Sequence, residues 1–560
     1  VIAEETPWLG GMLTSAGVSA TDGNHKMRQG LFGEFANALI MHYGSLEALK
    51  TGWVSNMLYS PKVAEQIFED WVSTYNNLTV IKNAVFRDIS ENADDGWTAT
   101  FETPEGPRTI SADIVIDCTE LGDVAKAAGI PYRVGMDSPA YAGEPMAIGP
   151  NDVVQDLTMV MTLKDYKKDV TIPRPEDYDE SLYYNSCKSA YNVENTTGQT
   201  IWTAGEMMSY GLLPGGEYMI NWPIYGNDYY VNLIDMTGGE RAEAIRKAKN
   251  HSLGFLYYLQ TKIGYNTLGL ADDQYPTEDL FPLIPYHRES RRIEGEYLFS
   301  VTEAASPFEY TGYRTGVAVG DYPVDHHHYQ YPDWSSIKIS FPKIVPFTVP
   351  LGTMIPKTRD NFLVAEKSIS VTNLINGSTR LQPVTMELGQ ASGALAALSI
   401  KKRLSPREVS VRDVQEALLS AGARLQPYLD LEPTSPDFLV LQRIGSTGIM
   451  RGKGETIGWS NEMRFRINDY LLKSELYLTD YYGIPYDGST AAISGAEFVD
   501  LIERAVRTLP GYTTDQAAGL PLDTPLRSAS NVRRLEAARL IDEVLDPFHT
   551  HRVGLQGEVL

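Results

Sequence analysis

Residues 376–393 read NGSTRLQPVTMELGQASG, and this stretch decides how the surrounding sequence is interpreted. Pro383 suits the first turn of a helix, where its missing N–H costs no hydrogen bond, and an alanine- and leucine-rich run continues to Lys402. The free N–H groups and partial positive charge of such a helix start would face an anionic group lying before it. Four small residues permit close packing of the helix: Gly389, Ala391, Ser392 and Gly393. A ligand-facing helix start and a plain buried helix both fit this stretch.

Apolar runs that are typical of buried strands flank this helix. Three of them lie at residues 1–3, 112–118 and 361–365, and their length and content suit a central parallel sheet. Residues 78–86 are also rich in β-branched side chains, and residues 97–103 alternate like a half-buried strand after a turn at 92–96. Strands that alternate with helices predict an α/β fold.

Composition limits the class of protein. The 560 residues are enough for two or three domains, and 43% hydrophobic with 21% charged residues is ordinary for a globular chain. A formal charge of −24 repels nucleic-acid phosphates, so nucleic acid is not an expected partner. We expect no membrane span, because no apolar run reaches the necessary length. Cys118 and Cys187 are too few for a disulfide framework, and the compartment stays open between export (periplasm or cell surface) and the cytoplasm.

Changes in composition divide the chain. Residues 1–140 and 351–403 carry the strand and helix patterns, which predicts one α/β domain built from two separated segments. Residues 141–350 mix acidic loops, aromatic-rich strands and one helix, which suits an inserted β-rich substrate domain. Charged amphipathic stretches follow, the clearest at 409–419, and they predict a separate, mostly helical module at 404–560.

Five stretches share the order and residue types of one protein family. The first is residues 4–18, EETPWLGGMLTSAGV, and the second is residues 116–125, IDCTELGDVA. Residues 288–297 (RESRRIEGEY) and 319–327 (VGDYPVDHH) follow, and the fifth is the stretch at 376–393. Together they resemble bacterial FAD-dependent oxidoreductases related to glutathione reductase and succinate dehydrogenase flavoproteins, some of which are labelled xanthan lyases. Five motifs in order are more specific than any one of them.

The resemblance implies a Rossmann-like FAD-binding domain in which the first and fifth stretches fold together around the flavin. A flavin site needs an acidic residue at the end of the second strand for the ribose, and Glu4 has that place. The implied contacts to flavin and pyrophosphate are Gly10, Gly11, Met12, Thr14 and Ser15, and the backbone of Val85 would meet the adenine. The other implied cofactor residues are Thr119, Gly122, Asp123, Arg380, Gln382, Pro383 and Met386. The helix start would face the negative charge of a reduced flavin.

No phosphate-binding G-x-G-x-x-G turn stands before Glu4 in the sequence. We therefore expect that about 30 residues precede Val1, the length of a strand-helix-strand unit up to its second strand. The sequence also departs from the family at Ala365-Glu366-Lys367, where Ala-Gly-Arg is usual in the loop approaching the pyrophosphate. A carboxylate there would disfavour phosphate unless Glu366 turns away or Lys367 compensates its charge.

Three consecutive histidines, His326, His327 and His328, follow Asp325. On a strand, Asp325 and His327 would share one face, and an aspartate beside a histidine fixes its tautomer and raises its basicity. We therefore predict His327 as the catalytic base for a substrate hydroxyl, with Asp325 as its partner. Alternate histidines with a carboxylate also resemble metal ligands, but no second cluster supplies the remaining ligands, so no metal is predicted. A merely structural histidine run is a third interpretation.

Arg288 and Arg291 are the other candidate catalytic residues. They could bind a substrate carboxylate or orient a sugar acid, because guanidinium forms a bidentate fork with such groups. An internal salt-bridge network with the neighbouring glutamates fits them equally well. Three tyrosines could line the same cavity or simply pack in the interior: Tyr286, Tyr322 and Tyr329.

The predicted reaction is oxidation of a small hydroxyl- or amine-bearing molecule by hydride transfer to FAD. The family's association with carbohydrate utilisation favours a sugar- or glycan-derived substrate. The alternative is a redox-inactive polysaccharide lyase or glycan-binding protein on the same scaffold, which would bind no FAD. In the C-terminal module, residues 441–476 weakly resemble the S-layer-homology type of repeat, which predicts docking to a partner or a cell wall.

Overall fold

The computed structural model describes residues 1–93, 95–337, 339–509 and 525–560. Two pairs of parallel strands organise its first region. β1 (Ile2–Ala3) pairs with β2 (Val80–Ile81), and β6 (Val115–Asp117) pairs with β16 (Phe362–Val364). All of β16 is buried, as expected for a central strand. The predicted α/β fold is confirmed, because a late segment of the chain returns to pair with a strand of the first segment.

An antiparallel sheet follows the first parallel pair. β3 (Val85–Glu91), β4 (Trp97–Thr103) and β5 (Gly106–Ala112) pair in that order. β4 coincides with the strand predicted at 97–103. The strand predicted at 78–86 is divided between β2 and β3, because Asn83 adopts a left-handed φ of 53° that no strand can include. The predicted turn at 92–96 includes residue 94, which lies outside the described residues.

Helices connect these strands. Their bounds are α1 (Gly30–Tyr43), α2 (Pro61–Ser73), α3 (Asp123–Ala127), α8 (Asn373–Thr379), α9 (Gln382–Lys402) and α10 (Val411–Ser420). α9 carries Pro383 in its first turn and ends at Lys402, so the predicted helix is confirmed. α10 matches the amphipathic stretch at 409–419 and buries Val411, Val414 and Leu418.

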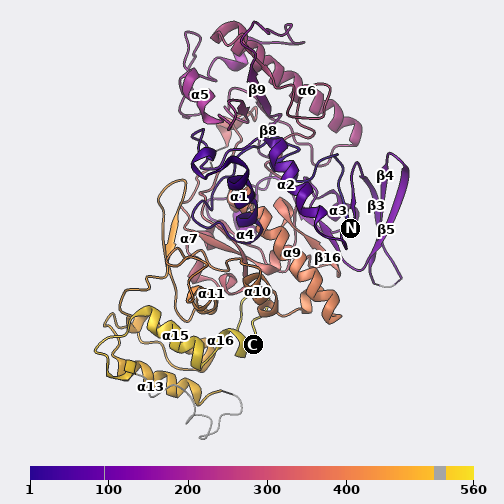
Figure 1. Ribbon diagram of the computed structural model, residues 1–560. Helices are drawn as coiled ribbons and strands as arrows, with labels where there is room; N and C mark the ends of the chain where they lie inside the picture. Colours follow the sequence, from indigo (N-terminus) through magenta and orange to yellow (C-terminus); the bar gives the residue numbers. More distant parts are fainter. Residues whose placement is uncertain (94, 338, 510–524) are drawn as a thin grey trace.

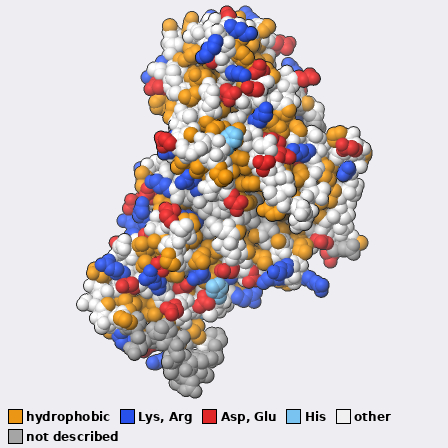
Figure 2. Space-filling view, in the orientation of Figure 1, with side chains coloured by type: hydrophobic (Ala, Val, Ile, Leu, Met, Phe, Trp, Pro, Cys, Tyr) orange, Lys and Arg blue, Asp and Glu red, His pale blue; other side chains and the backbone are white. Residues whose placement is uncertain are grey.

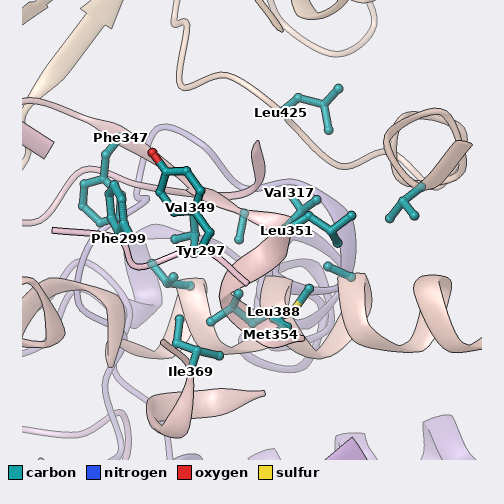
Figure 3. Close-up of a cluster of buried hydrophobic side chains, with 14 of the residues drawn as sticks. Tyr297, Phe299, Val317, Phe347, Val349, Leu351, Met354, Ile369, Leu388 and Leu425 are labelled. Atoms are coloured by element: carbon teal, nitrogen blue, oxygen red, sulfur yellow. The ribbon is translucent and has the colours of Figure 1, made fainter. Parts of the chain in front are cut away.

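The main hydrophobic core lies beside α9, where β14 (Gly316–Gly320) pairs with β15 (Phe347–Pro350). Figure 3 shows Leu388 of α9 next to Met354, with Val317, Leu351 and the aromatic side chains above them. Buried residues of α10 and Leu425 belong to the same core. The chain beyond residue 404 therefore still contributes to this core.

Residues 141–350 combine short antiparallel strands with helices. β9 (Met161–Asp165) lies between β10 (Tyr218–Ile220) and β12 (Leu268–Leu270). β8 (Leu157–Thr158) pairs with β11 (Asp228–Tyr229), and β13 (Arg292–Ile293) pairs with β7 (Tyr132–Arg133), which precedes this region. The helices here are α4 (Pro139–Ala142), α5 (Ala204–Tyr210), α6 (Gly238–Tyr258) and α7 (Val301–Ala305). The region is thus a mixture of both element types, with α6 as its longest element.

A second core occupies the C-terminal part of the chain, from Tyr428 to Leu545. Its helices are α11 (Phe438–Thr447), α12 (Thr479–Tyr482), α13 (Gly495–Val506) and α15 (Arg534–Val544), and α16 (Pro547–Thr550) follows. β17 (Lys453–Glu455) and β18 (Glu462–Arg464) form an antiparallel hairpin. Phe548 of α16 and Val553 return to the first core. The predicted boundary at residue 404 stays a prediction. Along the chain, residues up to Leu425 belong to the first core, and the second core begins at Tyr428.

The molecule is elongated in Figure 1, with α5 and α6 at one end, α13 and α15 at the other, and α1 and α9 between them. Figure 2 shows acidic and basic side chains interspersed over one face. Within the described ranges, no helix has both the length and the apolar character that a membrane crossing requires.

Candidate active site

The segment before and at the start of α1 lies against α9. Three side chains of α9 accept hydrogen bonds from it: Gln382 Oε1 from Asp22 N at 3.0 Å, Glu387 Oε1 from Asn24 Nδ2 at 3.3 Å and from Gln29 Nε2, and Gln390 Oε1 from Leu31 N at 3.0 Å. These contacts hold residues 22–31, which follow the first stretch, against the helix of the fifth stretch.

Glu4, the predicted ribose-binding residue, directly follows β1. Its Oε1 accepts hydrogen bonds from Thr6 N at 2.9 Å and Thr6 Oγ1 at 2.8 Å, and burial raises the pKa of Glu4. Ala84 N donates to Glu4 O at 2.8 Å, which places the exposed Val85 beside the end of β1. Glu4 and Val85 therefore lie together, as contacts to ribose and adenine require.

Gly10 and Gly11 form a left-handed turn with φ angles of 107° and 48°. A Cβ at Gly10 would lie 2.6 Å from the Phe68 ring, and one at Gly11 would lie 3.0 Å from Glu120 Oε1. Glycine is required here by both the conformation and the space.

The buried residues after this turn, Met12, Thr14 and Ser15, support it from within. Thr14 Oγ1 donates to Leu9 O at 2.6 Å, and Ser15 Oγ lies 3.1 Å from Thr6 Oγ1. Thr14 and Ser15 therefore shape the turn with hydroxyls that already have partners.

The loops after β6 and β16 meet beside this turn. Asp117 at the end of β6 accepts hydrogen bonds from Thr119 N at 2.8 Å and Thr119 Oγ1 at 2.7 Å. Gly122 has a φ of 67°, and a Cβ there would lie 3.1 Å from Ser368 Oγ. The close approach of the two loops brings predicted cofactor residues next to Glu366 and Lys367.

Glu366 occupies the position where the family usually has glycine, and it has the left-handed φ of 63° that glycine tolerates. Its Oε2 accepts hydrogen bonds from Lys367 N and from Lys367 Nζ, the latter at 2.8 Å. Lys367 Nζ also donates to Glu120 Oε2 at 2.6 Å, and Lys367 is buried. Burial raises the pKa of Glu366 despite this cation. The positive charge of Lys367 compensates the negative charge of the Glu366 carboxylate. This is one of the two ways in which we expect a glutamate at this position to be compatible with phosphate.

Arg380 and Gln382 flank the start of α9. Arg380 Nη1 donates to Tyr286 OH at 2.6 Å, and Nη2 donates to Asp325 Oδ2 at 3.0 Å. Gln382 Nε2 is buried with no hydrogen-bond partner in the part of the chain that the structure describes. Met386 packs against a neighbouring apolar cluster that includes Leu13. Arg380 thus links the predicted flavin motif to the histidine motif.

His327 lies between two carboxylates. Its Nδ1 is 3.1 Å from Asp228 Oδ2, and its Nε2 is 3.6 Å from Asp325 Oδ2. Residues 321–328 form neither helix nor strand, so the strand considered for Asp325 and His327 is absent from this segment. Gln155 Oε1 accepts a hydrogen bond from His327 N at 3.1 Å and Asp156 N donates to His327 O at 2.6 Å, so local partners replace a sheet neighbour.

The other two histidines are structural. His326 and His328 are buried and stacked, with ring centroids 5.2 Å apart. A Cβ at Gly377 would lie 2.4 Å from His326 Cδ2, so the absence of a side chain at Gly377 lets this loop pack on α8. Within the described residues, no group of three or more His, Cys, Asp or Glu side chains has an arrangement that could hold a metal ion.

The surroundings of His327 determine its protonation. Burial and the charge of Arg288 oppose the imidazolium, but Asp325 and Asp228 outweigh them and raise the pKa of His327. In the neutral ring, the short contact with Asp228 favours the proton on Nδ1. Nε2, 3.6 Å from Asp325, is then free to accept a proton. Asp228 therefore makes the shorter contact with the ring, and the role of Asp325 as the partner of His327 stays a prediction.

Arg288 supports this arrangement from the interior. Its Nη2 lies 3.3 Å from Asp228 Oδ1, and its Nη1 donates to Thr158 Oγ1 at 2.7 Å and to Asp156 O at 2.9 Å. The side chain is only 2% exposed. Arg288 is therefore a positioning residue for Asp228 and does not have a guanidinium free to bind a substrate carboxylate.

Asp123 and Arg291 form a separate network of ion pairs. Arg291 Nη1 donates to Asp123 Oδ1 at 2.6 Å, and Arg291 Nη2 donates to Asp235 Oδ1 at 2.9 Å. Arg241 Nη2 adds a bond to Asp123 Oδ1 at 2.8 Å. These charges satisfy one another, so Arg291 joins the internal salt-bridge network that was the alternative to a substrate-binding role, and the cofactor role of Asp123 stays a prediction.

Asp22 is a site residue that the sequence pattern did not reveal. Burial and the charge of Asp325 raise its pKa to about 7, although Arg380 and His327 act in the opposite direction. Its Oδ1 is buried without a partner among the described residues. Asp22 precedes Gly23 in an ordinary turn sequence, and Asp228 lies 99 positions from His327, so no local motif marks either residue.

A model of the FAD dependent oxidoreductase family matches residues 1–418. The chain belongs to this family. Among curated proteins, none matches the oxidoreductase.

Solved structures similar to this FAD dependent oxidoreductase include CabE, an aromatic hydroxylase from angucycline biosynthesis, at 16% identity over 29% of this chain and 31% of that chain, with a TM-score of 0.19. BexE, from BE-7585A biosynthesis, is 15% identical over 29% of this chain and 34% of its own, with a TM-score of 0.17. The p-nitrophenol 4-monooxygenase PnpA from Pseudomonas putida DLL-E4 is 13% identical over 45% and 49%, with a TM-score of 0.18. The similarity spans less than two thirds of each of these chains.

The cofactor of the family is FAD, and this oxidoreductase has suitable groups for it at two ends. Glu4 and Val85 lie together at the predicted adenosine end, and the unpartnered Gln382 Nε2 stands at the start of α9 for the flavin. The glycine turn at Gly10 lies beside Glu120, which pairs with the Lys367 cation. These are the groups that would hold FAD, and their predicted cofactor roles stay predictions.

Proposed function

We propose that this enzyme oxidises a small hydroxyl- or amine-bearing molecule, derived from a sugar, by hydride transfer to FAD. One observation carries the proposal: the His327 ring is held by Asp228 at Nδ1, its Nε2 lies 3.6 Å from Asp325, and Arg380 connects this cluster to the start of α9. A base that is fixed by one carboxylate and open at its other nitrogen suits proton removal from a hydroxyl.

FAD, when bound, supplies an acceptor for the hydride that leaves the substrate carbon. The substrate hydroxyl gives its proton to His327 Nε2 while its oxygen forms the new carbonyl bond. Asp228 stabilises the resulting imidazolium at Nδ1, and Arg288 holds Asp228 in place. The carboxylates of Asp22 and Asp325 can accept hydrogen bonds from further hydroxyl groups of the substrate, which favours a polyhydroxylated molecule.

The test uses the full chain purified with FAD and screened anaerobically against sugars, sugar alcohols and amines for bleaching of the visible flavin absorbance. In His327→Asn we expect the bleaching rate to fall by about 10²–10⁴-fold, with FAD content unchanged. His42→Asn, at an exposed histidine of α1, serves as the control. Bleaching at the wild-type rate in His327→Asn would exclude His327 as the base, and a protein that binds FAD but is bleached by no hydroxyl or amine compound would refute the proposed reaction.

A further inference from the structure

The hairpin of β17 and β18 carries an exposed tryptophan toward the active site. In Figure 1 this light-orange hairpin rises from the C-terminal region toward the middle of the molecule. Trp459 lies in the connection between the two strands and is 68% exposed. Its ring centroid is 5.4 Å from that of Tyr322, with 38° between the planes.

Asp321 fixes the hairpin loop against the segment that carries Asp22. Ser460 Oγ donates to Asp321 Oδ2 at 3.3 Å, and Asn461 N donates to Asp321 O at 3.1 Å. From the other side, Asn24 N donates to Asp321 Oδ1 at 2.7 Å. Lys26 also pairs with Glu462 of β18. Residues of the C-terminal region are therefore held directly at the edge of the candidate active site.

Tyr322 lies between Trp459 and the catalytic carboxylates. A Cβ at Gly23, the neighbour of Asp22, would lie 3.2 Å from Tyr322 Cβ, and Ser378 Oγ of α8 donates to Tyr322 O at 2.8 Å. Burial raises the pKa of Tyr322, and the charges of Asp22 and Asp325 raise it further. The aromatic pair thus extends from the reaction centre outward to solvent.

Two further tyrosine–tryptophan pairs lie near the Asp325 carboxylate. Tyr210 stacks on Trp222 with centroids 5.0 Å apart, and Tyr329 meets Trp334 at 4.7 Å. The pKa values of both tyrosines are raised by burial first and then by nearby carboxylates that include Asp325. Aromatic surfaces with a few charged groups at the centre form a surface that suits a ring-bearing polar ligand.

We propose that Trp459 is a specificity residue of the active site, which stacks on a sugar ring of the substrate that lies outside the reaction centre. The inference rests on the proposed function and extends it from a small sugar derivative to a substrate with more than one ring. A flat, exposed aromatic ring can cover the C–H face of a pyranose while hydroxyls at the ring edge stay solvated. The C-terminal region would then complete the substrate site in addition to any docking role.

Calorimetric titration of the FAD-loaded full chain with cellotriose, xylotriose, maltotriose and glucose tests the proposal. We expect a trisaccharide to bind the wild type more tightly than glucose does. In Trp459→Ala we expect its affinity to fall by about tenfold, with a much smaller change for glucose. Trp459→Phe should recover part of the affinity. Tyr470→Ala, at another exposed aromatic residue of the C-terminal region, should bind like the wild type.

Equal trisaccharide affinity in Trp459→Ala and the wild type would overturn the inference, as would the absence of binding by all four sugars. Once a substrate that reduces the flavin is identified, we expect Trp459→Ala to raise KM and to leave kcat unchanged. A loss of kcat, or of FAD, would show that Trp459 has a structural role instead. Flavin bleaching reports the proposed function independently, since it depends on His327 and not on Trp459.

Discussion

The two ring nitrogens of His327 have different surroundings, and this difference determines its chemistry. Nδ1 is engaged by Asp228 at 3.1 Å, whereas Nε2 faces Asp325 at a distance too long for a hydrogen bond. The two negative charges raise the pKa of His327 against burial and Arg288. A histidine with a raised pKa becomes a base only above that pKa, so the pH dependence of turnover reports these contacts.

Asp325→Asn removes one of the two charges that favour the imidazolium. The pKa of His327 should fall, and the neutral base should persist to lower pH. We expect the acid limb of log(kcat/KM) against pH to move down by about one unit. Asp70→Asn, at an exposed position of α2, should leave the limb in place. A limb that stays fixed or moves to higher pH in Asp325→Asn would show that another group controls it.

Sequence reasoning reached the parts of this site whose partners are close along the chain. Asp325 and His327 are two positions apart, and their proximity survives although no strand forms there. Asp228 and Asp22 come from distant segments, so only the folded chain brings them to His327. Arg291 could serve a substrate or a salt-bridge network on sequence grounds, and the positions of Asp123 and Asp235 decide for the network.

Among the elements, α9 carries the connections that hold the site together. Glu387 is 2% exposed and accepts hydrogen bonds from Asn24, from Gln29 and, at 2.7 Å, from Val319 N of β14. Burial raises the pKa of Glu387 to about 8, so a neutral carboxyl group is present near neutral pH. One side chain of the helix therefore fixes both the segment with Asp22 and the strand that leads to Asp321.

Glu387→Ala should leave these buried donors without an acceptor. We expect the free energy of unfolding to fall by about 2–4 kcal/mol, which chemical denaturation with intrinsic fluorescence would measure. Lys401→Ala, at an exposed position of the same helix, should change the stability little. Similar stabilities of the two variants would mean that water or rearranged side chains can replace the Glu387 contacts.

Element prediction succeeded where the local pattern agreed with the fold. Pro383 and the small residues after it identified α9, and the amphipathic stretch at 409–419 identified α10. The segment 321–328 does not form a strand because its backbone and side chains bond to Gln155, Asp156 and Asn24 rather than to a neighbouring strand. Such partners are invisible to a two-residue periodicity.

At the scale of the whole molecule, the C-terminal region is joined to the rest at several places. Phe548 and Val553 enter the first core, and the hairpin loop binds Asp321. A change in composition at residue 404 could not show this, because burial in a shared core depends on tertiary contacts and not on local charge. The five family motifs lie before residue 404, and their order predicted the fold of that part of the chain. The function of residues 404–560 stays a prediction.

The net charge of −24 also has a local consequence, because carboxylates gather where FAD phosphates are expected. Glu120 interacts electrostatically with Glu4, Glu5 and Glu366, and the buried Lys367 pairs with Glu120 and Glu366. Burial raises the pKa of Glu366, so this group is protonated at low pH and ionises as the pH rises through that raised value. Each ionisation adds a negative charge that opposes a diphosphate.

We therefore expect the Kd for FAD, measured by fluorescence titration of the deflavinated protein, to increase between about pH 6 and pH 8. Glu366→Gln should lower the Kd at the higher pH and flatten its dependence on pH. Glu47→Gln changes the net charge equally at an exposed site and should behave like the wild type. Riboflavin lacks phosphates, so its affinity should not follow the same pH dependence. If Glu47→Gln lowered the Kd as much as Glu366→Gln does, overall charge and not the Glu366–Lys367 pair would govern binding. A Kd independent of pH in the wild type would place the FAD phosphates away from this cluster.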